Sequence, residues 1–571
     1  MAAEQAAQVR ARPGLAGSQR APPPRGEAKH CEASGAWGCP IFLAQSPPMP
    51  KCLLHLLLAV LLAVTLALPW VWPFTAGPSA AVEPYLVAAV AAALLLALWP
   101  LGAAELGALE DGGAAGIAAA GWLLAALLSS GIALLQYFHR EETFFPWIDG
   151  SVPGQAFGNL RQPNLLATLL MIGLLALRWS LARAGRTVVS TSVAALAALL
   201  LLAALAATAS RVGLVELLLL GALTLWWARP GTRWRALAFA AAALLCYALA
   251  ALALPWLLQS SEGLAGRALV DRLEHAESTC GSRLILWRNV LHLIAAHPWA
   301  GWWDRGGLIY AHYITLYDGP RFCHILDNAH NLPLHLAVEL GVPAALLACA
   351  LALWLIWRGR PWAETDPGRQ LAWGVLGAIA LHSMVEYPLW YGPFQTAALL
   401  SLWLLWRTRR QPAPATDQGG ALAAARYALA ALVLAVCAYA GWDYRRVSQI
   451  YLPQEERAAA YRTVDPLAEA QKSWLFAGMV RFADLTMQRP TRDNAGWMLP
   501  TALQSLYFSP EPRVIERVIE SASWLGQDDL ALAHMARFKA AFPQEYQTWS
   551  ARNHQPATAP QEPDEELDDE D

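Results

Sequence analysis

The sequence predicts an all-α polytopic membrane protein with about eleven transmembrane helices, a long periplasmic loop and a C-terminal helical domain. Of the 571 residues, 56% are hydrophobic and only 15% are charged, and the mean hydropathy is +0.33. A soluble domain carries about 25% charged residues. Apolar runs of about 20 residues, the length that crosses a bilayer, recur along the chain. This composition excludes a disordered chain, a small disulfide scaffold and a strongly basic nucleic-acid-binding protein.

Eleven apolar runs are long enough to cross a membrane. We expect spanning helices over residues 53–72, 82–101, 114–136, 163–182, 188–207, 211–228, 235–256, 331–357, 370–387, 391–407 and 422–441. Pro388 and Pro393 favour two short spans over one kinked span around residues 386–393, because proline interrupts a helix.

The placement of arginine predicts the orientation of these spans. With the N-terminus in the cytoplasm, the cytoplasmic loops contain arginines at 183 and 186, 229 to 235, 358 to 369 and 407 to 410. The short loops on the opposite side contain no basic residue, as the positive-inside rule requires, and only the loop 101–113 departs from the pattern. An odd number of spans then places residues 257–330 and the tail from 442 in the periplasm of a bacterial inner membrane.

The spans divide the chain into six regions. Residues 1–50 are Pro-, Arg- and Gly-rich, so we expect a disordered segment, or one that is not translated if synthesis begins at Met49. The other regions are the transmembrane helices of 51–256, a periplasmic catalytic loop at 257–330, further transmembrane helices at 331–441, a periplasmic helical domain at 442–555 and an acidic disordered tail at 556–571. Helical pairs with interleaved small and aromatic residues in 442–555 predict a tetratricopeptide-like array.

Polar residues gather at the predicted outer ends of two spans, where ionisable groups are costly and usually functional. The run 157–175 places Arg161, Gln162 and Asn164 beside Pro163. A capped helix start is the alternative interpretation of this run. Arg211 follows a tight turn and lies at the outer end of the predicted span 211–228. The alternative interpretation of Arg211 is an arginine whose side chain extends to the membrane interface and has no further role.

Two further polar clusters lie in and after the long loop. Arg283 and Arg288 fall on a predicted surface helix, and guanidinium groups match phosphate oxygens in bidentate geometry. These arginines indicate an anionic ligand delivered from the membrane, although ordinary interfacial arginines have the same spacing. His324, Asp327 and His330 lie three residues apart, but no cysteine or second carboxylate supports a zinc site, so we expect no metal.

His330 suits a different chemistry, because a neutral imidazole can take a proton from a hydroxyl group near pH 7. A role as a helix cap is the alternative. Cys280 and Cys323 flank the same loop and face an oxidising compartment in the predicted topology. We therefore expect a disulfide between them.

Four motifs carry a resemblance to a known superfamily. GNLRQPNLLATLL (158–170) resembles the signature of PglL-type protein O-oligosaccharyltransferases. TASRVGL (208–214), the segment 281–301 and DNAHNLPLHLAVELGVP (327–343) are similar to successive motifs of the O-antigen ligase and polymerase (WaaL/Wzy) superfamily. HSMVEYPLWYGPFQ (382–395) with the helical tail resembles the C-terminal region of the protein-glycosylating branch.

The resemblance implies a metal-independent, inverting glycosyltransferase without a cofactor, fed by an undecaprenyl-pyrophosphate-linked glycan. It implies that Arg211, Arg283 and Arg288 bind the donor pyrophosphate, and that His330 is the general base. Residues matching the acceptor- or glycan-positioning set of that branch are Gln162, Asn164, Asn331 and Tyr387, with Tyr391 as the alternative tyrosine.

The resemblance favours transfer of the glycan to Ser or Thr of periplasmic or pilin-like acceptor proteins. Ligation of O-antigen to lipid A–core and polymerisation of O-antigen are the nearest alternatives. A transporter is a less favoured class, because its polar residues would lie at mid-membrane, often in internal repeats. Besides the donor and acceptor we expect membrane lipid, and no nucleic acid, as partners.

Overall fold

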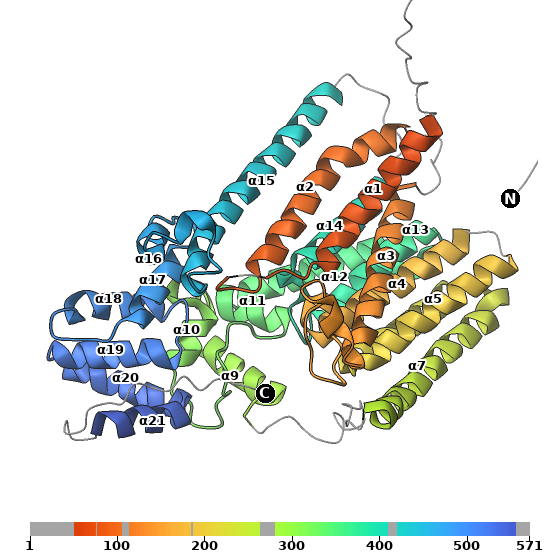
Figure 1. The fold of residues 1–571 in the computed structure, drawn as a ribbon. Helices are drawn as coiled ribbons and strands as arrows, with labels where there is room; N and C mark the ends of the chain where they lie inside the picture. The colour runs from red at the N-terminus through yellow and green to blue at the C-terminus, as the bar shows by residue number, and fades with distance from the viewer. Residues whose placement is uncertain are drawn as a thin grey trace, which may run out of the picture. The chain divides into compact units, whose positions relative to one another are not determined.

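A computed structural model describes residues 51–75, 77–105, 113–183, 187–262, 280–408 and 419–554, and every regular element in these ranges is an α-helix or a 3₁₀ helix (Figure 1). The predictions for segment 1–50, for residues 263–279 of the long loop and for the tail 556–571 lie outside the described residues.

Each of the eleven predicted apolar runs contains helix. The helices are α1 (Lys51–Val71), α2 (Val82–Glu105), α3 (Gly113–Tyr137), α4 (Pro163–Arg183), α5 (Val188–Ala207), α6 (Arg211–Trp227), α7 (Arg233–Glu262), α11 (Leu332–Leu340), α12 (Val342–Gly359), α13 (Pro367–His382), α14 (Gly392–Arg407) and α15 (Gly419–Ser448). Among the described residues, seven helices are long and apolar enough to cross a membrane. Helices α6, α13 and α14 have only 17, 16 and 16 residues, so the number eleven stays a prediction.

The prediction of a single span over 331–357 is wrong, because two helices occupy this run. Gly341 ends α11 with a φ of 87°, a left-handed conformation that a helix cannot continue through. The amide of Val342 donates a hydrogen bond of 2.8 Å to the carbonyl of Pro298, which fixes the break against the preceding loop. The candidate span therefore begins at Val342 and runs to Ala363.

Helix α4 is the centre of the apolar core. Every residue from Leu165 to Leu177 is buried, since α4 packs against α3, α5, α6 and α13. A helix that is apolar on all sides is suited to such a position inside the helical bundle. Helix α6 approaches closely because Gly213 has no side chain: a Cβ there would lie 2.9 Å from Cβ of Ala167.

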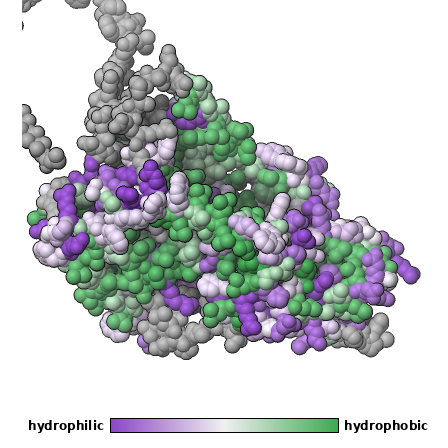
Figure 2. All heavy atoms as spheres, turned by 180° about the vertical axis from the view of Figure 1, so that it is seen from behind, coloured by the Kyte–Doolittle hydropathy of each residue, from purple (hydrophilic) through white to green (hydrophobic). Residues whose placement is uncertain are grey.

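Large apolar side chains are exposed along α5, α7 and α12. Figure 2 shows broad apolar areas between hydrophilic ones on the face turned away in Figure 1. On α12 the exposed side chains include Leu347, Leu353 and Trp357, which are 72%, 66% and 63% exposed. Such surfaces are costly in water and suit the hydrocarbon region of a bilayer.

The long loop and the C-terminal region are also helical. Their elements are α9 (Arg283–Ala296), η5 (Trp303–Arg305), α10 (Gly307–Ile314), η8 (Gln449–Tyr451), η9 (Ala459–Tyr461), α16 (Pro466–Ala470), α17 (Ala477–Met487), α18 (Ala495–Ser505), α19 (Pro512–Trp524), α20 (Asp528–Ala541) and α21 (Pro543–His554). The connections between the apolar runs contain the short helices η2 (Glu141–Phe144), η3 (Gly158–Leu160), η4 (Pro230–Thr232), η6 (Pro361–Ala363) and η7 (Pro388–Trp390). Helices α18, α19 and α20 pack consecutively, and the tetratricopeptide-like assignment of this region stays a prediction.

Two contacts join the loop to the C-terminal helices. The Tyr313 hydroxyl of α10 lies 2.7 Å from Nδ1 of His534 in α20. The rings of Tyr310 and Tyr507 stack with their centroids 4.2 Å apart. The C-terminal helices therefore support α10, which packs against both α9 and α11.

Candidate functional site

Glu386 joins side chains from distant parts of the chain. Its Oε2 lies 2.7 Å from Nδ1 of His330, and its Oε1 is paired with the guanidinium of Arg283. The Asn164 amide donates to the same Oε1 at 3.4 Å, and the Ser210 hydroxyl donates to Oδ1 of Asn164 at 2.7 Å. We call these five residues the Glu386 cluster.

Helix ends bring the members of the Glu386 cluster together. Asn164 lies in the first turn of α4, Ser210 is the N-cap of α6, and Arg283 is the first residue of α9. His330 comes immediately before the N-cap of α11. Glu386 lies between the end of α13 and η7. The cluster therefore lies where apolar helices begin or end, in agreement with the polar runs that the sequence places there.

Two residues at this site have a left-handed backbone. His330 has a φ of 49° and Ala209 a φ of 46°. Each precedes an N-cap, since Asn331 caps α11 through the amide of Leu334 and Ser210 caps α6. This conformation is uncommon for residues with a Cβ and is found at functional positions where the surroundings hold it in place.

The charges at the site are arranged around a buried carboxylate. Burial acts to raise the pKa of Glu386, but the hydrogen bond with His330 and the charge of Arg283 outweigh it and hold that pKa below its ordinary value. An ionised carboxylate only accepts hydrogen bonds, so Nδ1 of His330 carries a proton. In the neutral imidazole Nε2 is then the acceptor, on a side chain that is 17% exposed. The arrangement can take a proton from a hydroxyl group at Nε2.

Asn331 and Tyr387 lie beside the Glu386 cluster. The Asn331 amide donates to the carbonyl of Met384 at 2.9 Å, which holds the start of α11 next to the segment that carries Glu386. The rings of Tyr387 and His330 pack edge to face, with their centroids 4.8 Å apart. The ring of Tyr391 stacks on that of Tyr387, with a centroid distance of 6.0 Å. Tyr387 is therefore in contact with the ring of His330, and Tyr391 supports Tyr387.

Gln162, Arg211 and Arg288 have other surroundings. Oε1 of Gln162 accepts from the amide of Leu165 at 2.9 Å and so caps α4, the contact that the helix-start interpretation expects of this run. Arg211 is the exposed first residue of α6, next to Ser210. Arg288 is also exposed, and it projects about 140° around α9 from Arg283, because five residues separate them. Within the described residues, Arg288 makes no hydrogen bond or ion pair with a member of the Glu386 cluster.

The zinc interpretation finds no support in the side-chain arrangement. Across the described ranges, no three side chains among His, Cys, Asp and Glu are grouped so that they could hold a metal ion. Nδ1 of His330 is already paired with Glu386, and the ring of His324 packs edge-on against Phe322.

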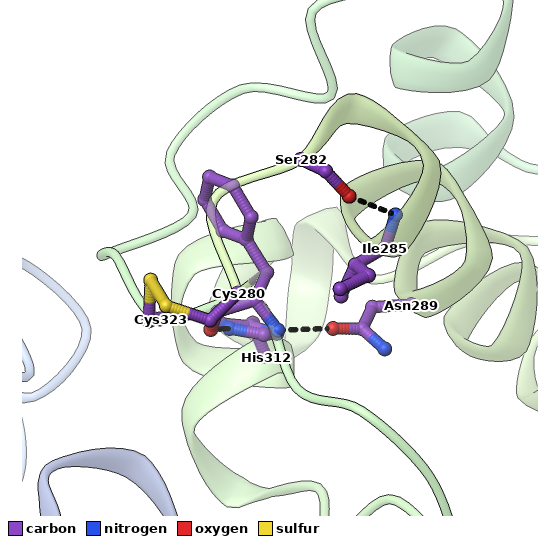
Figure 3. Close-up of a disulfide and its surroundings, with 7 residues drawn as sticks. Cys280, Ser282, Ile285, Asn289, His312 and Cys323 are labelled. Atoms are coloured by element: carbon purple, nitrogen blue, oxygen red, sulfur yellow. Dashed lines mark hydrogen bonds between the residues drawn. A yellow bond between two sulfur atoms is a disulfide. The ribbon is translucent and has the colours of Figure 1, made fainter. Parts of the chain in front are cut away.

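Cys280 and Cys323 are joined by a disulfide with a Cα–Cα distance of 5.4 Å (Figure 3). Beside it, the amide of Phe322 donates to Oδ1 of Asn289 at 2.8 Å, and its carbonyl lies 3.2 Å from Nε2 of His312. Burial lowers the pKa of His312 to about 3, so this imidazole is neutral. The disulfide therefore fastens the segment that leads to His330 to the start of α9, which carries Arg283.

Alkylation tests this disulfide. We expect the non-reduced protein to bind two fewer thiol-reactive labels than the reduced protein, counted by intact mass. We also expect Cys280→Ser and Cys323→Ser to lower the stability equally, by about 2–4 kcal/mol, because each opens the same loop. Equal label counts before and after reduction would contradict the pairing.

Glu386 was not predicted as a site residue, although it lies in the run HSMVEYPLWYGPFQ (382–395) that carries part of the resemblance. The signal was present, because a carboxylate at the end of an apolar helix is as costly as the arginines that were selected. Its role depends on partners 56, 103 and 222 residues away, which no local pattern reveals.

Family comparisons cover the segments that build this site. Residues 156–179 match the family described as protein glycosylation ligase, residues 196–349 match O-antigen ligase, and residues 370–556 match the C-terminal part of virulence factor membrane-bound polymerase. Asn164, His330 and Glu386 each lie in a different one of these segments. No curated protein matches the sequence.

An all-helical membrane chain with this site and these matches is a membrane glycan ligase or transferase. It belongs to the superfamily of O-antigen ligases, O-antigen polymerases and PglL-type protein glycosylation ligases.

Proposed function

We propose that this protein transfers a glycan from an undecaprenyl-pyrophosphate carrier to Ser or Thr hydroxyls of periplasmic or pilin-like proteins. The observation that carries the proposal is the contact between Nδ1 of His330 and Glu386, which leaves Nε2 as the proton acceptor beside Arg283. The site would face the periplasm, at the outer surface of a bacterial inner membrane, with the N-terminus in the cytoplasm.

The proposed reaction is a single displacement. The acceptor oxygen attacks the anomeric carbon of the glycan while its proton passes to Nε2 of His330. The bond between that carbon and the pyrophosphate oxygen breaks, and the carrier leaves as an anionic pyrophosphate. One displacement inverts the configuration at the anomeric carbon. Glu386 stabilises the imidazolium that forms, as a buried carboxylate does in other His–carboxylate pairs.

Arginines would stabilise the charge that develops on the leaving pyrophosphate. Arg283 can do so while paired with Glu386, because a guanidinium has five donors and its side chain is 34% exposed. Arg211 would contribute from the start of α6. Arg288 lies on another face of α9, so we assign it a contact farther along the donor.

Polar side chains around the base would position the reactants. We assign acceptor or glycan contacts to Tyr387 and Asn331, which adjoin His330, and to Asn164 within the Glu386 cluster. Gln162 can share in this role only through its amide nitrogen, because its oxygen caps α4.

The match of residues 156–179 to a protein glycosylation ligase supports a protein acceptor. Lipid A–core is the second candidate acceptor, and the match of residues 196–349 to O-antigen ligase favours it. Both candidates use the same donor chemistry and the same base. The acceptor class alone separates them.

An acceptor assay decides between these functions. Purified protein is mixed with lipid-linked glycan and with either a pilin-like protein or lipid A–core. We expect the mass of the protein acceptor to increase by one glycan, attached to Ser or Thr. We also expect the reaction to proceed when a chelator removes divalent metal ions. Glycan that appears only on lipid A–core would contradict the protein acceptor and support the second candidate.

A further inference from the structure

Next to the Glu386 cluster, three buried polar side chains form a second group that the proposed reaction does not use. The hydroxyl of Thr168 in α4 lies 2.7 Å from Oε1 of Glu216 in α6 and 2.8 Å from Nδ1 of His382 in α13. All three side chains are completely buried. We call them the Thr168 network. Ionisable groups inside a membrane domain are costly and are usually retained for function.

Two members of the network lie about one helical turn from members of the Glu386 cluster. Thr168 is four residues after Asn164 on α4, and its hydroxyl lies 3.2 Å from the Asn164 carbonyl. His382 is four residues before Glu386, and its carbonyl accepts a 2.9 Å hydrogen bond from the Glu386 amide. The network is therefore linked directly to the backbone of both residues.

The third member links the same helices through α6. Glu216 lies six residues after Ser210, the N-cap whose hydroxyl donates to Asn164. Side chains of α4, α6 and α13 are therefore in contact at the Thr168 network, through the single hydroxyl of Thr168. The starts of α4 and α6 and the segment that follows α13 are connected again at the Glu386 cluster.

The network is not built for stability alone. Within the described residues, Oε2 of Glu216 and Nε2 of His382 are buried without a hydrogen-bond partner. A buried polar atom without a partner costs free energy that an apolar side chain of similar size would not. Retaining two such atoms in an apolar core indicates that the hydrogen bonds through Thr168 serve the site.

We propose that Thr168, Glu216 and His382 are positioning residues for glycan transfer. They hold Asn164 and Glu386 in register, so that one carboxylate reaches Arg283 and His330 together. The inference rests on the proposed function for its reaction, but it holds for either acceptor. Because all three side chains are completely buried, we expect none of them to touch donor or acceptor. Loss of the network should therefore lower kcat and leave KM for the donor nearly unchanged.

A pair of substitutions at Thr168 tests this role. Thr168→Val replaces the hydroxyl by a methyl group of the same shape, and we expect kcat to fall about ten- to a hundred-fold with donor KM changed less than about two-fold. Thr168→Ser restores the hydroxyl, and we expect kcat within about three-fold of the parent. The matched control is Thr396→Val in α14, because the Thr396 hydroxyl donates to the Gly392 carbonyl and, within the described residues, to no other group. We expect this variant to keep the kcat of the parent.

A second pair of variants, at His382, tests the same role if the Thr168→Val protein does not fold. His382→Asn keeps a polar atom near the position of Nδ1, whereas His382→Leu removes it. We expect the leucine variant to lose kcat and the asparagine variant to retain most of it. Equal kcat in both variants, or a loss in Thr168→Val that Thr168→Ser shares, would overturn the proposal.

The two proposals fail in different ways. Each variant is compared with the parent on whichever acceptor the parent glycosylates. If the parent glycosylates an acceptor other than protein, the proposed function is wrong, but the ratio of kcat between each variant and the parent still tests the positioning role. If Thr168→Val has the kcat of the parent, the positioning role is wrong, but the acceptor result still stands.

Discussion

We expect His330→Ala to lower kcat for the proposed glycan transfer by about 10²- to 10⁴-fold, the range for loss of a positioned general base. The variant removes the proton acceptor and leaves Arg283 paired with Glu386, so we expect donor KM to change little. Initial rates with lipid-linked glycan and a saturating acceptor measure the effect. Activity equal to the parent would remove His330 from the mechanism.

His324→Ala is the matched control for this variant. His324 lies six residues earlier in the same segment, is exposed, and contacts the ring of Phe322 rather than the Glu386 cluster. We expect near-parent activity. A loss as large as that of His330→Ala would instead favour a shared ligand set that includes both histidines.

Glu386→Gln has the second largest expected effect, a fall in kcat of about 10²-fold or more, by analogy with the loss of the carboxylate in His–carboxylate pairs. The amide keeps the shape of the side chain, but it has one oxygen where the carboxylate has two, and His330 and Arg283 contact different oxygens of Glu386. Either His330 or Arg283 then faces the NH₂ group of the amide, which donates rather than accepts. The proton of His330 is then no longer held on Nδ1. Initial rates measured as for His330→Ala give the result, and a kcat within two-fold of the parent would contradict it.

An ion pair at the start of α13 supplies the control for this variant. Arg369 is paired with Glu364 at 2.6 Å, with both side chains 12% exposed, beside the other end of that helix. Glu364→Gln breaks this ion pair, as Glu386→Gln breaks the pair with Arg283, so we expect some loss of stability with kcat retained. An equal loss of kcat in both variants would mean that loss of an ion pair acts through the fold and not through the site.

The lowered pKa of Glu386 gives this variant a pH signature. A carboxyl whose pKa is lower in the folded state stabilises the fold above its unfolded pKa, and this contribution is lost as the pH falls through the folded pKa. The ordinary pKa of glutamate is 4.5. The stability advantage of the parent over Glu386→Gln should therefore persist from neutral pH down to about 4.5 and narrow below it.

The positions of the helices could be predicted because an apolar run of about 20 residues has few stable alternatives in a membrane protein. The break at Gly341 was missed, although Gly341 followed by Pro343 is a local signal for the end of one helix and the start of the next. A tertiary contact also holds this break. The backbone of Gly341 lies against that of Trp299 so closely that a Cβ would collide with it. No pattern within residues 331–357 reveals that neighbour.

The candidate site was predicted in part. Arg283, His330 and Asn164 stood out because polar groups at the ends of apolar helices are rare, and the structure brings these three together through Glu386. Arg288 was selected with Arg283, although five residues on a helix do not share a face. The Thr168 network was missed because a threonine, a glutamate and a histidine in three apolar runs form a group only when α4, α6 and α13 pack.

A double-mutant cycle on His330 and Glu386 tests the central claim, that Glu386 acts on the reaction through His330. The kcat of His330→Ala, Glu386→Gln and the double variant is measured with one acceptor and saturating donor. Residues that act as a unit lose activity non-additively. We predict that the double variant is no slower than His330→Ala alone, within about two-fold. A double variant whose loss equals the product of the two single losses would contradict the claim.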